Sequence, residues 1–356
     1  MQKLVPFLQH LHSSASTRPR WSEQVAVAMA SVSFFSTTPN LVRNSEYGES
    51  FEHPDPELFA VAAKRKIDWS SNRMGLLSDR QLRLYLDVLR LELSALREVN
   101  LATLNILIKA HVEQIPFQGI DAFTGNQLLL DDDSVFHKVI MQRRGGYCFE
   151  LNSVFGRLLL TLGFKIHMRA ARTRWGRPVN TPLTPLGHLL FCVDLGNEGQ
   201  HFADVGFGGP NPFKAVPVEG EAEPYRVQRL DEEGNTEVAI KSTGRKGASV
   251  SWRPIYHVFP HPQKWIDFMP QNWYVTLHPR SLFRHVLMVG RFVDNSWLTL
   301  VNGRFCRRSI SGQVKQHHIS DVDEVIRLFD TEFALKLNTD MDLHFLRSKL
   351  IARFRN

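Results

Sequence analysis

The sequence predicts an α+β protein in which helices come first, strands follow, and both are mixed near the end. Between residues 78 and 162, apolar side chains recur at spacings of three and four, which is the period of an amphipathic helix. After Gly163 the pattern changes to short strands separated by turns that contain Gly and Asn. The last part combines strands with a helix around residues 322–337. The middle part is therefore predicted to be an antiparallel sheet or a small barrel.

Two helices are predicted in the first part of this region. Ser78 can cap the first, because a Ser side chain accepts a hydrogen bond from the free backbone N–H groups of a first turn. Its apolar residues run to Leu89. The second covers residues 101–114 and ends before Pro116, since proline disfavours the helical conformation of the residue before it.

Two more helices precede the strands. The third is predicted over residues 135–143, with Asp133 or Ser134 as its cap. The fourth is predicted over residues 148–162, and Gly163 closes it as a C-cap glycine.

The predicted strands are short apolar or alternating runs bounded by turn residues. They cover residues 165–173, 188–195, 200–205, 225–230, 237–242, 287–293 and 298–301.

The end of the chain, residues 342–356, has the pattern of a basic amphipathic helix. Leu346, Leu350, Ile351 and Phe354 are expected on one face. Such a helix can lie on a membrane surface, but docking on the protein core is the favoured interpretation.

Composition and charge exclude several classes of function. The chain has 356 residues, of which 43% are hydrophobic, enough for a sizeable core in two or three domains. The formal net charge of +7 is not concentrated in blocks and no nucleic-acid recognition motif accompanies it, so no nucleic-acid partner is predicted. The longest apolar stretch near the start, residues 25–35, is too short to span a bilayer, and no membrane role is predicted.

The cysteines favour a reducing compartment and argue against a metal site. There are three, an odd and low number for the length, so no disulfide framework is expected. No CxxC or HExxH spacing occurs, and no metal is predicted. Cys192 and Cys306 lie in apolar segments and are expected to act as small hydrophobic residues.

Residues 1–73 differ from the rest of the chain. They are rich in Ser and Thr, and the first 45 are basic. This profile fits a mitochondrial presequence, a disordered tail, or an extension upstream of a true start at Met74. The predicted location is cytoplasmic, with the mitochondrion as the alternative if residues 1–73 act as a presequence.

Cys148 is the candidate nucleophile. It follows a Gly-Gly-Tyr segment at the start of the fourth predicted helix, where free backbone N–H groups and the helix dipole stabilise a thiolate. Arg143 and Arg144 add positive potential, unless one of them pairs with a carboxylate such as Glu150. A buried structural cysteine is the alternative for this residue taken alone.

A nucleophilic cysteine needs a base, and the base needs a residue that orients it. His188 opens a predicted strand after a loop rich in Pro and Gly, a suitable place at the edge of a cleft. Asp204 lies in an apolar run, where a carboxylate is costly without a partner such as an imidazole N–H. Cys148, His188 and Asp204 therefore form a coherent Cys–His–Asp set. A core histidine, a turn-capping aspartate and His201 as a competing base are the alternatives.

Four segments in this order resemble the arylamine N-acetyltransferase family, over about residues 78–337. They are IPF (115–117), RGGYCFELN (144–152), HLL (188–190) and DVGFG (204–208).

The resemblance implies three parts related to the papain and transglutaminase fold. They are a helical bundle that carries the cysteine, an antiparallel β-barrel that carries the His and Asp, and an α/β lid. We place them at residues 74–163, 164–270 and 271–356, after the extension of residues 1–73.

The resemblance also implies the reaction. Members of the family transfer an acetyl group from acetyl-CoA, by a ping-pong reaction through an acyl-cysteine, to an arylamine, arylhydroxylamine or arylhydrazine. Cys148 would be acylated, His188 would relay protons, and Asp204 would orient His188. Some fungal members are thought to prefer malonyl-CoA, so an N-malonyltransferase is an alternative.

Four further residues match family positions that contact the substrates. Phe117 and Phe207 match aromatic positions of the acceptor pocket, with core packing as the alternative for Phe117. Thr184 and Ser281 match positions near coenzyme A.

Two other kinds of protein stay open at this point. One is a transglutaminase-like or amidase-like thiol enzyme, and the other is a non-catalytic relative that binds an aromatic ligand. The sequence does not define the oligomeric state.

Overall fold

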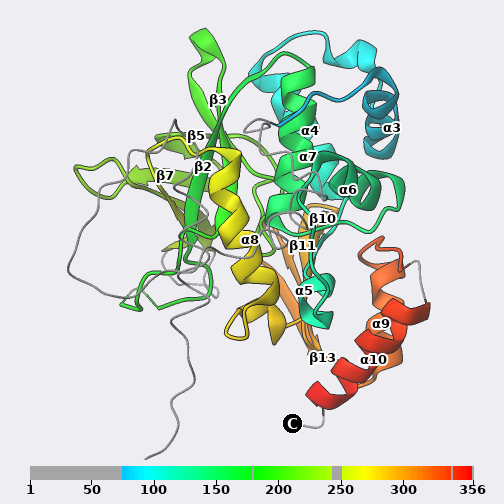
Figure 1. Cartoon of the computed structure of the whole chain (residues 1–356). Helices are drawn as coiled ribbons and strands as arrows, with labels where there is room; N and C mark the ends of the chain where they lie inside the picture. Colours follow the sequence, from blue (N-terminus) through cyan, green and yellow to red (C-terminus); the bar gives the residue numbers. More distant parts are fainter. Residues whose placement is uncertain (1–73, 179, 243–250, 338–339, 355–356) are drawn as a thin grey trace, which may run out of the picture. The chain divides into compact units, whose positions relative to one another are not determined.

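The computed structural model describes residues 74–178, 180–242, 251–337 and 340–354 (Figure 1). The predicted N-terminal extension and its presequence lie outside the described residues. The three-part division of the remaining chain stays a prediction.

The helices lie in two groups along the chain, before and after a long run of strands. They are α3 (Asp79–Leu89), α4 (Leu101–Gln114), α5 (Ile120–Thr124), α6 (Asp132–Phe136), α7 (Cys148–Thr161), α8 (Phe268–Leu277), α9 (Val322–Thr331) and α10 (Asp340–Phe354). Short 3₁₀ or π turns cover Leu93–Leu96, His137–Met141, Gly196–Glu198, Trp265–Asp267 and Leu282–Arg284.

The strands form two antiparallel sheets. They are β1 (Phe117–Gln118), β2 (Lys165–Thr173), β3 (His188–Asp194), β4 (Gln200–Ala203), β5 (Val216–Pro217), β6 (Gly220–Ala222), β7 (Tyr225–Arg229), β8 (Thr236–Ser242), β9 (Ser251–Val258), β10 (Met288–Val293), β11 (Ser296–Val301), β12 (Arg304–Ser309) and β13 (Val314–His318).

The first two predicted helices are confirmed. Ser78 caps α3 in a capping box: its side chain accepts from the backbone N–H of Gln81, whose side chain accepts from the backbone N–H of Ser78. Helix α4 has the predicted bounds, and Asn100 caps it.

The predicted cap of the third helix is wrong. Asp131, and not Asp133 or Ser134, caps α6, because its carboxylate accepts from the backbone N–H of Ser134 at 2.9 Å. Several consecutive residues here are suitable caps, and only the backbone turn selects among them. The helix then widens into the π turn His137–Met141 and ends before residue 143.

The end of α7 is confirmed at Gly163, whose φ is +89°. Gly163 and Phe164 donate backbone hydrogen bonds to the carbonyls of Leu160 and Leu159, at 3.1 and 2.9 Å. This is the Schellman arrangement, in which a glycine accepts the left-handed conformation without strain.

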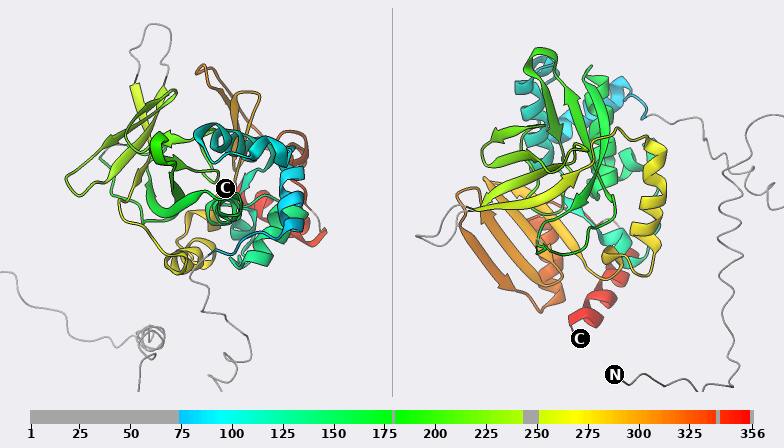
Figure 2. Two further views of the ribbon diagram at one scale, coloured as in Figure 1. Left: turned by 90° about the horizontal axis from the view of Figure 1, so that it is seen from above. Right: turned by 90° about the vertical axis from the view of Figure 1, so that its left-hand side faces the viewer.

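The larger sheet has eight strands in the order β5-β4-β3-β2-β9-β8-β7-β6. Its edge strands β5 and β6 contact each other, so the sheet curves into a nearly closed barrel (Figure 2). The predicted antiparallel barrel is confirmed. The neighbours β3 and β4 carry the two predicted partners of Cys148 at one end.

The smaller sheet, in the order β1-β10-β11-β12-β13, joins one strand from the helical part of the chain to four strands from its C-terminal part. Strand β1 follows α4, and it pairs with β10 with Phe117 opposite Gly290. Phe117 is therefore fixed between the helical part and the C-terminal part.

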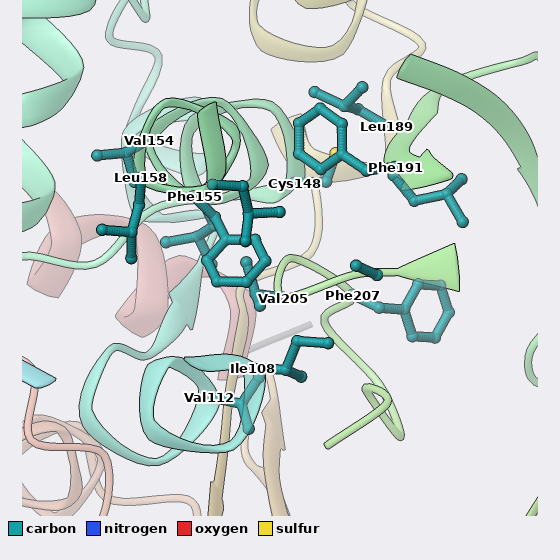
Figure 3. Close-up of a cluster of buried hydrophobic side chains, with 14 of the residues drawn as sticks. Ile108, Val112, Cys148, Val154, Phe155, Leu158, Leu189, Phe191, Val205 and Phe207 are labelled. Atoms are coloured by element: carbon teal, nitrogen blue, oxygen red, sulfur yellow. The ribbon is translucent and has the colours of Figure 1, made fainter. Parts of the chain in front are cut away.

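Two apolar cores hold these layers. The first surrounds α7, most of whose residues are buried, and in Figure 3 the side chains of Ile108 and Val112 reach from α4 toward Phe155. The second lies between the smaller sheet and helices α5, α9 and α10.

The C-terminal helix docks on the second core, as favoured from the sequence. Leu346 and Leu350 are fully buried, but Ile351 is 41% exposed, so its predicted place on the buried face is wrong. Leu346 and Leu350 are four residues apart and share a face, whereas residue 351 lies well around the helix from 346. Helix α9 ends earlier than predicted, at Thr331, and Ala334 takes a positive φ of 50° in the turn that follows. Among the residues described, no helix is both long and apolar enough to cross a membrane.

Candidate active site

Cys148 is the first residue of α7 and is 6% exposed. Its Sγ lies 3.8 Å from the carbonyl oxygen of Gly187. The loop before it packs against β1, because Gly146 accepts from the backbone N–H of Gln118 at 2.8 Å. Gly145 has a φ of +62°, and a Cβ there would lie 2.2 Å from the carbonyl oxygen of Pro116. Only glycine fits this turn, which fixes where α7 begins.

A buried group of four charges supports the start of α7. Lys138 Nζ lies 2.7 Å from Glu150 and 2.6 Å from Asp121, and Arg144 lies 3.2 Å from Asp121. Glu150 also accepts from the backbone N–H of Tyr147 at 3.1 Å. An arginine here thus pairs with a carboxylate, as the alternative held, but the carboxylate is Asp121, and Lys138 lies against Glu150. Arg144 is directed toward Asp121.

His188 and Asp204 lie at the ends of neighbouring strands. His188 is the first residue of β3, and Asp204 directly follows β4. His188 Nε2 lies 2.6 Å from Asp204 Oδ2, and both side chains are buried. Because Nε2 makes this contact, Nδ1 is the nitrogen left to interact with the thiol of Cys148.

This surrounding holds His188 in its charged form. Burial alone lowers its pKa, but the Asp204 carboxylate and, to a smaller extent, Cys148 raise it to about 10. Without Asp204, a buried imidazole would give up its proton readily. The pair therefore stores a proton beside the thiol.

Asp204 is held by residues that the sequence analysis did not select. Asn152 Nδ2 donates to Asp204 Oδ1 at 2.9 Å, and so does the backbone N–H of Gly206 at the same distance. Asp204 also interacts with Tyr256: burial, followed by this carboxylate, raises the pKa of the tyrosine well above its ordinary range. Asn152 lies four residues after Cys148 on α7, a spacing that could have placed it on the same face.

Cys148 and His188 line one cavity of about 810 Å³. Four of the other predicted residues, Phe117, Phe207, Thr184 and Ser281, line it too, whereas Asp204 lies behind His188. All seven predicted site residues are thus brought to one place. Neither an aspartate nor a glutamate is among the described lining residues.

The aromatic residues form the inner wall. The ring of Phe207 meets the His188 imidazole edge-on, with 5.4 Å between the ring centres. The ring centres of Phe117 and Phe283 are 6.3 Å apart. Phe117 is both a lining residue and part of the first core, so the two interpretations of this residue are compatible.

Both predicted hydroxyl residues already donate to the backbone. Thr184 donates to the carbonyl of Thr173 at 3.1 Å, and Ser281 to that of Val275 at 2.5 Å. Each hydroxyl can therefore only accept from a ligand in this arrangement. In the described part of the chain, no group of three or more His, Cys, Asp or Glu side chains is placed to hold a metal ion.

Comparison with known proteins identifies relatives of this chain in sequence and in structure. A sequence model of the N-acetyltransferase family matches residues 100–341. The arylamine N-acetyltransferase / N-hydroxyarylamine O-acetyltransferase of Salmonella typhimurium is 32% identical over 74% of this chain and 92% of its own. The Escherichia coli arylamine N-acetyltransferase is 32% identical over 69% and 86%. The solved M. smegmatis arylamine N-acetyltransferase superposes with a TM-score of 0.69 at 27% identity, covering 77% of this chain and 99% of that one.

Proposed function

Because this chain belongs to the arylamine N-acetyltransferase family of acyltransferases, we propose that it acetylates aromatic amines through an acyl-cysteine on Cys148, with acetyl-CoA as donor. The observation that carries the proposal is the contact of 2.6 Å between His188 and Asp204, beside a thiol that opens on the same cavity. The donor and the acceptor would use this cavity in turn, which is a ping-pong reaction.

In the first half-reaction, the Cys148 thiolate attacks the thioester carbonyl of acetyl-CoA. The backbone N–H groups at the start of α7 are free of helical partners and are candidates to stabilise the oxyanion. The tetrahedral intermediate collapses by breaking the bond to the coenzyme sulfur. The charged His188 gives its proton to that sulfur, and CoA leaves as a thiol.

In the second half-reaction, the arylamine nitrogen attacks the acetyl-cysteine. His188, now neutral, takes the proton of the nitrogen, and Cys148 leaves as the thiolate. Asp204 keeps Nε2 occupied and stabilises the imidazolium that forms again. Each half-reaction thus moves one proton through the same imidazole, and the two balance.

The cavity suits these two substrates. Phe117, Phe207 and Phe283 offer flat apolar surface for an aromatic amine. We assign Thr184 and Ser281 to the coenzyme, whose amide N–H groups can donate to their hydroxyl oxygens. The partners proposed are small molecules, and the cytoplasm, where thiols stay reduced, is the proposed location.

Mass spectrometry tests the acyl-enzyme. After incubation with acetyl-CoA alone, the peptide that contains Cys148 should gain about 42 Da, the mass of one acetyl group on a covalent intermediate. The peptides with Cys192 and Cys306 serve as internal controls, and a Cys148→Ser variant should show no thioester adduct and no turnover. The adduct should disappear when an aniline is added.

A parallel donor screen separates the alternatives. Acetyl-, propionyl- and malonyl-CoA are compared for the rate at which they load Cys148. Faster loading from malonyl-CoA would replace the acetyltransferase by an N-malonyltransferase. No adduct from any acyl-CoA, with a glutamine amide cleaved instead, would overturn the proposal in favour of a transglutaminase-like or amidase-like enzyme.

A further inference from the structure

A small surface groove lies beside the active-site cavity and shares Trp175 with it. The indole of Trp175 lines both spaces. The groove lies between the two sheets: Arg253 of β9 comes from the barrel, and Arg308 of β12 comes from the smaller sheet. It is thus formed where the two sheets meet, next to the cavity that holds Cys148.

The two guanidinium groups are gathered around the indole. The Arg253 guanidinium lies 4.5 Å from the centre of the Trp175 ring, and that of Arg308 lies 5.9 Å from it. A guanidinium held against an aromatic face keeps the N–H groups along its edge free for a ligand. Trp175 therefore positions both guanidinium groups and leaves their N–H donors available to a ligand.

These cations face no anion among the described residues. Neither arginine has a carboxylate oxygen within 4 Å there, and no described Asp or Glu lines the groove. The other cation of the groove, Lys241, pairs with Glu223 at 2.5 Å. Burial lowers the pKa of Arg308; Cys306 opposes this shift, and the neighbouring charge of Arg253 adds to it to a smaller extent. An anion bound between the two arginines would relieve that repulsion.

We propose that Arg253 and Arg308 bind the 3′-phosphate of the acyl-CoA donor. The inference rests on the proposed function, which places the thioester at Cys148. The 3′-phosphate is a dianion at the opposite end of the coenzyme from the thioester, and the groove is separate from Cys148 but shares Trp175 with the cavity that Cys148 lines. Two arginines with free edge donors match the charge of a phosphate monoester and its pairs of acceptor oxygens.

The kinetic test compares two donors and four proteins. Acetyl-CoA and acetyl-3′-dephospho-CoA are given to the wild type and to the Arg253→Gln, Arg308→Gln and Arg307→Gln variants. Arg307 is the matched control, because it is the neighbour of Arg308 on β12 and pairs with Glu332 at 3.6 Å.

The wild type should show a KM about tenfold higher for the dephospho donor, as expected for one charge-assisted contact. Arg253→Gln and Arg308→Gln should raise the KM for acetyl-CoA about tenfold and leave that for the dephospho donor unchanged, while Arg307→Gln behaves as the wild type. An unchanged KM for acetyl-CoA in both variants, or an equal loss with both donors, would overturn the assignment.

Two further measurements separate this inference from the proposed function. Acetylation of Cys148 by p-nitrophenyl acetate, which has no nucleotide, should proceed at the wild-type rate in both variants. Calorimetry with adenosine 3′,5′-bisphosphate needs no chemistry: it should bind the wild type about tenfold more tightly than Arg308→Gln, whereas AMP should not distinguish them. If no acyl donor loads Cys148, the proposed function fails. The calorimetry alone then tests whether the groove binds the phosphate, and equal affinity of the wild type and Arg308→Gln would overturn the assignment.

Discussion

Asn152 gives a strong test of how the site is held, because its side chain joins α7 to both strands that carry the partners of the thiol. Its amide donates to the carbonyl of Leu189 at 2.7 Å and to Asp204 at 2.9 Å, and it accepts from the backbone N–H of Val205 at 3.1 Å. Asn152 itself is fully buried. The Asn152→Ala change removes all three hydrogen bonds at once.

The cost can be estimated group by group. The backbone N–H of Val205 loses the partner it has in the structure, and an unsatisfied buried donor costs about 1–3 kcal/mol. The carbonyl of Leu189 loses a donor, while Asp204 keeps the contacts from His188 and Gly206. We expect the free energy of unfolding to fall by about 3 kcal/mol and the acylation rate of Cys148 to fall at least about tenfold, since Asp204 is less well fixed.

Urea denaturation and acylation by p-nitrophenyl acetate measure the two effects. Asn126→Ala is the matched control, because that side chain is exposed. Asn152→Asp keeps the size of the side chain but replaces the donor by a second carboxylate beside Asp204, so it should be at least as damaging to the acylation rate. A loss of stability below 1 kcal/mol together with an unchanged acylation rate in Asn152→Ala would refute the reasoning.

Three other changes test the charges of the molecule. The pKa of His188, about 10 in the folded state against 6.5 for the free group, makes its stabilising contribution complete below pH 6.5 and lost as the pH rises through 10. The wild type should therefore lose its advantage in unfolding free energy over His188→Gln by roughly 1 kcal/mol per pH unit in this window, and an equal difference at pH 7 and pH 9.5 would contradict it. Lys138→Met leaves two buried carboxylates facing each other and should cost about 3–5 kcal/mol by urea denaturation; a loss under 1 kcal/mol would show that they are protonated or solvated. Lys349→Met removes the ammonium that binds the carbonyls of Phe123 and Arg284 and should cost about 1–2 kcal/mol, unlike the exposed control Lys315→Met.

The sequence was sufficient where the signal is local. Ser78, the glycine at position 163 and the bounds of α4 follow from caps and from a period of three to four residues. Cys148 and His188 could be selected because Cys148 begins a helix and His188 begins a strand, and the start of a helix or strand can be recognised in the sequence pattern. Their residue type and their place in the predicted elements are known from the sequence without their tertiary contacts.

The elements that were not predicted depend on distant parts of the chain. Strand β1 has two residues and no period, and it exists because β10 pairs with it. Strand β9 contains Pro254, which argues against a strand, but a register shift at Val238 and Ala239 of β8 accommodates the proline. Tyr256 lies on this same strand, so its interaction with Asp204 could not be predicted from the sequence either. Helix α8 has Pro270 in its first turn, where proline is tolerated although it resembles a stop signal.

The distribution of charge around the cavity bears on which amine reacts. The acids near Cys148 are already used: Asp204 faces His188, and Glu150 faces Lys138. No described lining residue is an acid, whereas Arg177 and Arg280 line the cavity. Such a lining attracts an anionic donor and repels an ammonium ion. An arylamine is neutral near pH 7, because the ring withdraws the nitrogen lone pair, whereas an alkylamine is protonated. Under the proposed function, the same arginines that favour the coenzyme therefore also select aromatic over aliphatic amines, before any contact with Phe117 or Phe207.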